Sequence, residues 1–174
     1  MTAIDDLEDA RQDLESLLLD VLNSTLGEEA FTTDEPLPPG PIATSRLSIH
    51  DEVEDAYLGI EVRVGAVLAR LLASKMMAAG DPTPDDLLDA VGELGNIVGG
   101  NVKTLLYHTA RLSLPMADLN AEIGQESEED LHGSLRIAAS AFGQTAQVTL
   151  TPDAPVDGLY WPPSQEDEAL EKQL

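Results

Sequence analysis

Hydrophobic residues recur along the chain with two spacings, which predict helices and strands. Three stretches repeat apolar residues every three to four positions, as one side of a helix does, over residues 3–24, 66–79 and 83–108. Five stretches repeat them at every second position, as a half-buried strand does, over residues 46–50, 57–64, 111–117, 131–142 and 145–150. We therefore predict an α+β fold, with a mixed or antiparallel sheet of about five strands and long helices packed on one face.

Local signals predict where the helices begin and end. Thr83 can cap the helix that follows it, and Pro84 suits its first position. The helix of residues 66–79 is apolar on more than one side, so we expect it to be largely buried, its two methionines included. Gly80 is placed to end that helix.

Turn signals separate the strands. The acidic stretch 51–55 predicts a hairpin loop between the first two strands, and Gly143-Gln144 predicts a tight turn between the last two. Pro115 lies within a predicted strand, which favours an edge strand or a bulge because proline has no N–H to donate.

The two ends of the chain differ from its middle. The amphipathic helix of residues 3–24 could pack on the domain or pair with a second copy, and the proline-rich stretch 35–41 after it cannot continue a helix. Near the other end, we expect the aromatic cluster at residues 160–163 to dock on the domain and the remaining tail to be disordered. We predict an acidic N-terminal segment (1–35), a central domain (36–151) and an acidic tail (152–174).

Acidic residues dominate the charge. The chain holds 33 Asp and Glu against 9 Lys and Arg, a net charge of −24. Such a charge repels nucleic acids and anionic lipids, so we expect neither nucleic-acid nor membrane binding, although a saline cytoplasm also favours acidic proteins. The chain has no cysteine, which excludes disulfides and thiol nucleophiles. An acidic N-terminus and the lack of an apolar run of about 20 residues predict a cytoplasmic protein.

The helix of residues 83–108 places a carboxylate and an amide opposite its apolar stripe. At about 100° per residue, its apolar side chains share one sector: Leu87, Val91, Leu94, Val98, Val102 and Leu105. About half a turn away lies a second cluster, which we call the acid–amide ridge: Asp89, Glu93, Asn96 and Gly100. Glu93 and Asn96 are three residues apart and therefore neighbours on the helix surface. Exposed pairs of this kind are also common on ordinary solvated helices.

Glycines interrupt this helix at a cost of about 1 kcal/mol each relative to alanine. They are Gly92, Gly95, Gly99 and Gly100. Gly92 and Gly99 share one flank, where we expect close packing against another backbone. Gly100 lies on the ridge, where the missing side chain leaves room for a partner. Asn101 falls near the edge of the apolar sector, and we expect it to hydrogen-bond buried backbone.

Other catalytic patterns are missing from the sequence. The histidines (His50, His108 and His132) are scattered, with no ligand spacing and no acidic partner nearby, so we expect no metal site. No P-loop ending and no Gly-x-Ser-x-Gly elbow occurs. An acid and an amide remain, and they can act on an electrophile that a partner supplies. The amide can hold a water in line with a phosphoryl group, and the carboxylate can bind a cation on that partner.

The residues around the ridge resemble those of a known family. Glu93-x-x-Asn96, preceded by Asp89 and followed by Gly100-Asn101-x-Lys103 and a strand with Leu114-Pro115, resembles the CheX-type chemotaxis phosphatases of the CheC/CheX/FliY group. The resemblance runs over about residues 44–150, and the single copy of the motif is similar to CheX rather than to the duplicated CheC. The acidic N-terminal extension and the tail with Trp161 depart from the family.

The resemblance implies a phosphatase of two-component signalling that hydrolyses the aspartyl phosphate of a CheY-like receiver domain. It implies that Asn96 orients the attacking water and that Glu93 pairs with the receiver's lysine, and we expect Asp89 and Gly100 to contact the same partner. Mg²⁺ would belong to the receiver, with no cofactor in this chain. CheX-like proteins often dimerise, so a homodimer is a further expectation.

Two other functions compete with this one. The same helix face could bind a receiver or another signalling partner without hydrolysis, because the motif has only two functional residues. Alternatively, the helix of residues 3–24 could be the pairing device of a structural or assembly protein.

Overall fold

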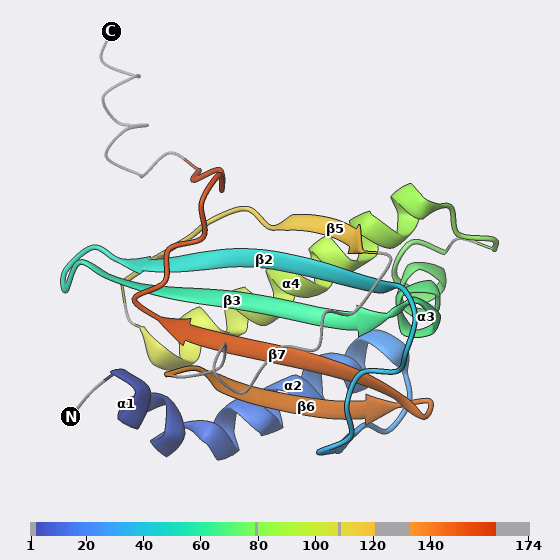
Figure 1. The fold of residues 1–174 in the computed structure, drawn as a ribbon, viewed down its shortest axis with the longest axis horizontal. Helices are drawn as coiled ribbons and strands as arrows, with labels where there is room; N and C mark the ends of the chain where they lie inside the picture. The colour runs from blue at the N-terminus through green and yellow to red at the C-terminus, as the bar shows by residue number, and fades with distance from the viewer. Residues whose placement is uncertain (1–2, 79, 108, 121–132, 163–174) are drawn as a thin grey trace, which may run out of the picture.

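In the computed structural model, which describes residues 3–78, 80–107, 109–120 and 133–162, seven strands form one antiparallel sheet (Figure 1). The strands are β1 (Phe31–Thr32), β2 (Ile42–Asp51), β3 (Ala56–Gly65), β4 (Arg111–Leu112), β5 (Met116–Asn120), β6 (Leu135–Ala141) and β7 (Gln144–Pro152). Their order is β1-β6-β7-β3-β2-β4, and β5 pairs with β2 along the same edge as β4.

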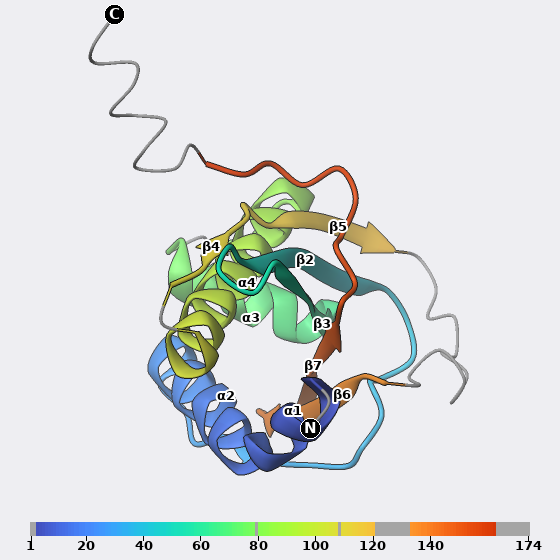
Figure 2. The same cartoon turned by 90° about the vertical axis from the view of Figure 1, so that its left-hand side faces the viewer.

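The helices lie together on one face of this curved sheet (Figure 2). They are α1 (Ala3–Asp9), α2 (Arg11–Leu26), α3 (Ala66–Met76) and α4 (Pro84–Leu106). α4 packs against β2, β3 and β5, α3 against β3 and β7, and α2 against β6. The predicted α+β fold is confirmed. Within the described part of the chain, none of these helices combines the length and the hydropathy of a membrane span.

The sheet has two strands more than the five predicted, because short strands leave no alternation to detect. β1 is only two residues long and was not predicted. The predicted strand 111–117 is split into β4 and β5 around Pro115, as the proline indicated. In the gap, the backbone N–H of Leu114 donates to the carbonyl oxygen of Tyr160 at 2.8 Å instead of to a strand.

Two helix predictions were wrong in detail. The predicted helix 3–24 is broken at Ala10, although alanine is a strong helix former and nothing in the sequence marks the break. α3 ends at Met76 rather than at residue 79, and Met77 after it is 44% exposed. The expectation that both methionines are buried therefore fails, because the chain leaves the helical layer at this point.

The turn between β6 and β7 lies one residue earlier than predicted. Ala141 pairs with Gln144, so the two turn residues are Phe142 and Gly143. Both have positive φ angles, 52° and 68°. Positive φ at both positions is the geometry of a tight hairpin turn, and a phenylalanine in the first position gives no sequence signal for it.

The core fills the space between the helices and the inner face of the sheet. Alternate residues of β3 and β7 face it, such as Ile60 and Val148. The N-terminal helix completes it with buried leucines of α2: Leu14, Leu18, Leu22 and Leu26. Of the two uses left open for this helix, the structure therefore shows packing within the chain. The predicted segment boundaries at residues 35 and 151 stay predictions.

The outer face of the sheet is crossed by the segment of residues 153–162, which we call the C-terminal strap (Figure 1). The backbone N–H of Val156 donates to the Ser48 Oγ at 3.2 Å, and the strap comes so close to Gly59 that a Cβ there would lie 2.7 Å from the Ala154 oxygen. Near its end, the Trp161 ring meets the Tyr57 ring edge-on, at 6.4 Å between centroids. The predicted docking of the aromatic cluster is confirmed for Trp161.

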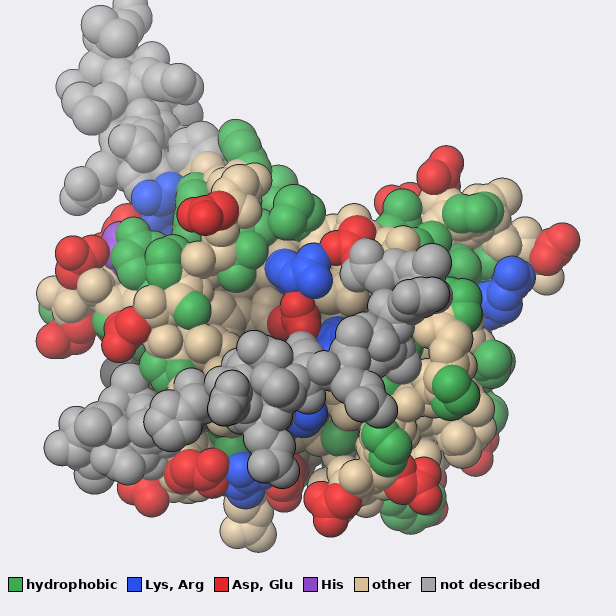
Figure 3. Space-filling view, in the orientation of Figure 1, with side chains coloured by type: hydrophobic (Ala, Val, Ile, Leu, Met, Phe, Trp, Pro, Cys, Tyr) green, Lys and Arg blue, Asp and Glu red, His purple; other side chains and the backbone are tan. Residues whose placement is uncertain are grey.

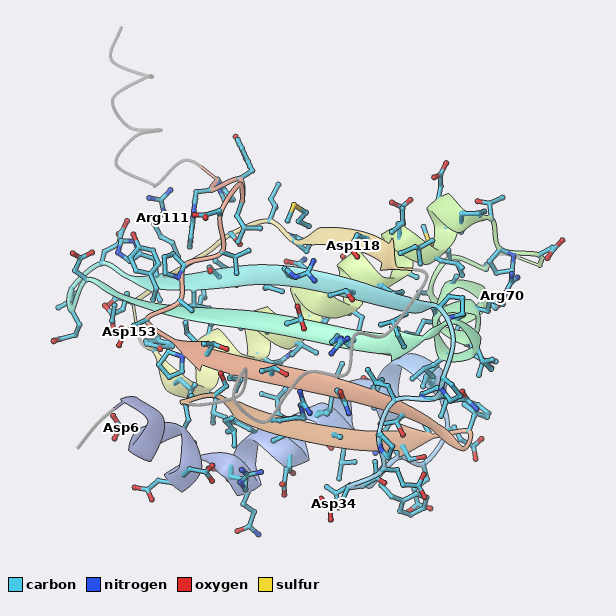
Figure 4. The ribbon with its side chains drawn as sticks, viewed as in Figure 1. Asp6, Asp34, Arg70, Arg111, Asp118 and Asp153 are labelled. Carbon is cyan, nitrogen blue, oxygen red and sulfur yellow. The ribbon has the colours of Figure 1, made fainter. Side chains whose placement is uncertain are left out.

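Charged side chains meet at the centre of the outer face (Figure 3). Arg46 of β2 donates to Glu61 of β3 at 2.8 Å and to Asp118 of β5 at 2.5 Å (Asp118 is labelled in Figure 4). Burial works against the charge of this guanidinium, but the two carboxylates outweigh it and raise the pKa of Arg46. The network ties three strands together on the side away from the helices.

Candidate functional site on helix α4

Helix α4 begins at a complete capping box. The Thr83 Oγ1 accepts from the backbone N–H of Asp86 at 3.3 Å, and the Asp86 carboxylate accepts from the backbone N–H of Thr83 at 2.7 Å. Pro84 occupies the first turn, as predicted. These bonds satisfy donors that a helix start leaves open, and they fix the direction in which the helix leaves the loop.

Two glycines let α4 lie close against strand β2. A Cβ at Gly95 would lie 2.1 Å from the Ser45 Oγ, and one at Gly99 would lie 2.1 Å from the Leu47 Cδ1. Gly99 does make a close packing contact, but with leucine side chains rather than with another backbone as predicted. Gly92 has only ordinary spacing, 3.8 Å to the Ala117 Cβ, and the tight contact at Gly95 was not predicted. The helix bearing the ridge therefore lies directly against the sheet.

The structure places the acid–amide ridge on the open side of α4. Asp89 and Glu93 are exposed, and Asn96 is half-buried one turn further along. Gly100 has open space around it, with no atom within 4 Å of an added Cβ. Among the described residues, the side chains of Glu93 and Asn96 have no hydrogen-bond or ion-pair partner. Both groups are thus available to a partner, while their catalytic and binding roles stay predictions.

A hollow of about 650 Å³ adjoins the Glu93 end of the ridge. It is lined by Thr25, Met76, Met77, Asp89, Ala90 and Glu93. The methionines give it an apolar wall where α3 ends, and the carboxylates give it an acidic one. Sequence reasoning missed this part of the site because it assigned both methionines to the core.

Three residues near or beyond the ridge differ from expectation. Leu105 is 42% exposed rather than buried, because a hollow separates it from α2. Asn101 is also exposed, and its Nδ2 donates to the Ile97 oxygen of the same helix at 2.8 Å rather than to buried backbone. His50 does have an acidic partner, with Nε2 3.0 Å from the Asp55 Oδ1. His108 and His132 lie outside the described residues.

The ridge is acidic and holds no metal cluster of its own. No group of three His, Asp or Glu side chains in the described residues is arranged to hold a metal ion. Asp89 and Glu93 give the ridge its negative charge, and the nearest basic residue that follows on the same helix is Lys103. Such a surface attracts a cationic group and offers a carboxamide beside it.

A comparison with protein families bears on this face of α4. The family described as "Chemotaxis phosphatase CheX" matches residues 51–133, a range that contains the whole ridge. The match covers just under half of the chain, and this part of the sequence is similar to the CheX family. No curated protein sequence matches it.

Solved structures with a similar fold include CheX and CheC-like proteins. CheX from Vibrio vulnificus has a TM-score of 0.61 at 15% identity, covering 80% of this chain and 93% of that one. A CheC-like protein from Shewanella sp. PV-4 has a TM-score of 0.59 at 19% identity, covering 88% and 100%. The CheX–CheY–BeF3–Mg²⁺ complex from Borrelia burgdorferi matches with a TM-score of 0.56 at 15% identity, covering 82% and 97%. At these identities, the likeness shows a shared CheX-like fold.

Proposed function

We propose that this chain accelerates hydrolysis of the aspartyl phosphate on a CheY-like receiver domain. The observation that carries the proposal is the acid–amide ridge. Glu93 and Asn96 lie on the open side of one helix, without partners in the described chain, in the range that matches the CheX family. The related CheX of Borrelia burgdorferi has been solved in a complex with CheY, which supports a receiver as the partner.

Asn96 would position the water. A carboxamide can donate and accept hydrogen bonds at once, so it can orient a water without taking its proton. The water oxygen attacks phosphorus while the bond between phosphorus and the receiver's aspartate oxygen breaks. Inorganic phosphate and a free carboxylate result. Positioning a water in line can supply several kcal/mol of catalysis, and Mg²⁺ bound by the receiver would neutralise the phosphoryl oxygens.

Glu93 would fix the receiver in place. Its carboxylate, one turn before Asn96, would pair with the receiver's lysine beside the phosphorylated aspartate. Such a pair gains strength when docking excludes water from it. Asp89 adds a second negative charge one turn earlier, and the bare backbone at Gly100 would let the receiver approach closely.

The test is phosphate release from a receiver domain phosphorylated by acetyl phosphate. We expect Asn96→Ala to lose about 100-fold of the acceleration, since the water is no longer held in line. Binding to the same receiver activated with BeF3⁻ should be retained. Gln12→Ala, which removes an exposed carboxamide from α2, is the matched control and should keep full activity.

Two results would count against the proposal. Undiminished activity in Asn96→Ala would remove the assigned role of the amide. Tight binding by the unaltered chain with an unchanged phosphate lifetime would instead favour a non-catalytic receiver-binding module.

A further inference from the structure

A second hollow runs along α4 on the side that faces α2, and we call it the α2–α4 groove. Its volume is about 650 Å³. It is lined by Asp13, Ser16, Leu17, Asp20, Val21 and Ser24 of α2 and by Ile97, Asn101 and Leu105 of α4. The two helices touch elsewhere along their length and lie side by side in Figure 2.

The groove combines an apolar surface with an acidic wall. Leu105 is exposed, and Leu17 and Ile97 are half-buried. On the α2 side, Asp13 and Asp20 are exposed, and neither carboxylate has an ion pair or a hydrogen bond within the described chain. Elsewhere on α2, by contrast, Glu15 lies 3.8 Å from Arg11 in an ion pair. The groove therefore presents uncompensated negative charge beside apolar surface.

The groove is continuous with the acid–amide ridge. Ile97 and Asn101 directly follow the ridge residues Asn96 and Gly100 in the sequence, so they lie about 100° further round the same helix. Between these two directions on the helix lies Thr104, an exposed residue whose Oγ1 donates to the backbone oxygen of Gly100 at 2.9 Å. Because both surfaces lie on α4, a domain that docks on the ridge is also close enough to contact the groove.

We propose that the α2–α4 groove is a second contact for the receiver and sets which receivers are accepted. It would take a lysine or arginine from the receiver's surface beside the phosphorylation site. The long aliphatic stem of such a side chain suits Leu17 and Leu105, and its charged head suits Asp13 and Asp20. This inference rests on the proposed function, because the ridge brings the receiver to the groove.

Charge disfavours the other occupants. A second copy of this chain carries a net charge of −24 and would bring like charge to an acidic wall. The sequence beyond the described residues, 163–174, has four acids and one lysine and would be repelled in the same way. A cationic surface on a different protein is the complementary choice.

The test compares two pairs of substitutions that change the net charge equally. Asp13→Asn with Asp20→Asn neutralises the groove. Asp34→Asn with Glu35→Gln neutralises two exposed acids near β1, at the far edge of the sheet from α4 (Asp34 is labelled in Figure 4). Both are assayed on a receiver that the unaltered chain dephosphorylates, with KM and kcat measured separately at low and high salt.

We expect the groove pair to raise KM about five- to tenfold with kcat within about twofold of the unaltered chain, and the effect to shrink at high salt. Asp13→Lys with Asp20→Lys should exceed tenfold, and Leu105→Ser should raise KM at any salt. The distant pair should leave KM unchanged, and melting temperatures confirm that each variant folds.

Equal KM values for the groove pair and the distant pair would overturn the inference and leave the phosphatase proposal standing. An unaltered chain that neither binds nor dephosphorylates any candidate receiver would overturn the phosphatase proposal, and the groove assignment with it.

Discussion

Gly95 of α4 and Ser45 of β2 approach so closely that no side chain fits between them. A Cβ added at Gly95 would lie 2.1 Å from the Ser45 Oγ and 2.8 Å from the Ser45 Cβ. Ser45 is fully buried, and its hydroxyl has no hydrogen-bond partner in the described residues. The contact sets how far α4 stands from the sheet, and with it the position of Glu93 and Asn96 on the other side of the helix.

Gly95→Ala should therefore destabilise the protein even though alanine is the better helix former. Overpacking in a closed contact typically costs about 1–3 kcal/mol in the free energy of unfolding. Gly100→Ala is the matched control, since its methyl group meets open space and should stabilise the helix by about 0.5–1 kcal/mol. Urea unfolding measures both, and adding Ser45→Gly to Gly95→Ala should restore part of the loss. Similar changes in stability for the two alanine variants would contradict the packing argument.

A longer side chain at Gly100 should separate folding from function. Gly100→Gln has room to fold, but its side chain would stand on the ridge between α4 and a docked receiver. We expect an unchanged melting temperature and a KM at least about tenfold higher for phospho-receiver, because the steric block acts only on the complex. Gly80→Gln places the same side chain in open space outside the helix and serves as the control. If Gly100→Gln turns over receiver normally, Gly100 does not lie in the interface.

The ridge and its helix could be predicted from sequence because both depend on local chemistry. The capping residues Thr83 and Pro84, the apolar period of α4 and the Glu93–Asn96 spacing are all encoded within one stretch of chain. The close contact of Gly95 with Ser45 could not be predicted in the same way. It depends on which strand passes behind the helix, and that partner is 50 residues away in sequence.

The surfaces flanking the ridge were missed for the same reason. Met77 and Leu105 carry the apolar character of core residues, and periodicity alone assigns them to the core. They are exposed because α3 ends early beside one and α2 leaves a hollow beside the other. Hollows between helices are properties of tertiary packing, and a single sequence gives no direct signal for them.

The capping box of α4 predicts a pH dependence of stability. The pKa of Asp86 is lowered mainly by the hydrogen bond from the backbone N–H of Thr83 and, to a smaller extent, by the one from the Thr83 hydroxyl. A carboxyl whose pKa is lower in the folded state stabilises the fold at pH values above its unfolded pKa, and this contribution is lost as the pH falls through the folded pKa. The difference in unfolding free energy between the unaltered chain and Asp86→Asn should therefore be largest at pH 7. It should become smaller as the pH falls below about 4.

Asp85→Asn provides the comparison for this prediction. Asp85 is an exposed acid in the same first turn, and no hydrogen bond of the capping box involves it. Denaturant titrations of the three proteins from pH 3 to pH 7 measure the gaps. A gap for Asp86→Asn that stays constant over this range, or that matches the gap for Asp85→Asn throughout, would show that the cap carries no pH-dependent stability.

The C-terminal strap offers a prediction that needs no partner protein, because Trp161 is the single tryptophan of the chain. Its ring meets the stacked His50 and Tyr57 rings edge-on, and Arg111 donates to the neighbouring Pro162 oxygen at 2.5 Å. Tyr57→Ala removes one aromatic contact of this kind, worth about 0.5–1.5 kcal/mol, and should let the strap detach for part of the time. Acrylamide should then quench Trp161 fluorescence more strongly, while the far-ultraviolet circular dichroism stays the same.

Tyr160→Ala is the control, because it removes a side chain that is 62% exposed and should leave the quenching of Trp161 unchanged. Equal quenching in Tyr57→Ala and the unaltered chain would mean that the hydrogen bonds from the Leu114 backbone N–H and the Arg111 guanidinium hold the strap without the aromatic contact.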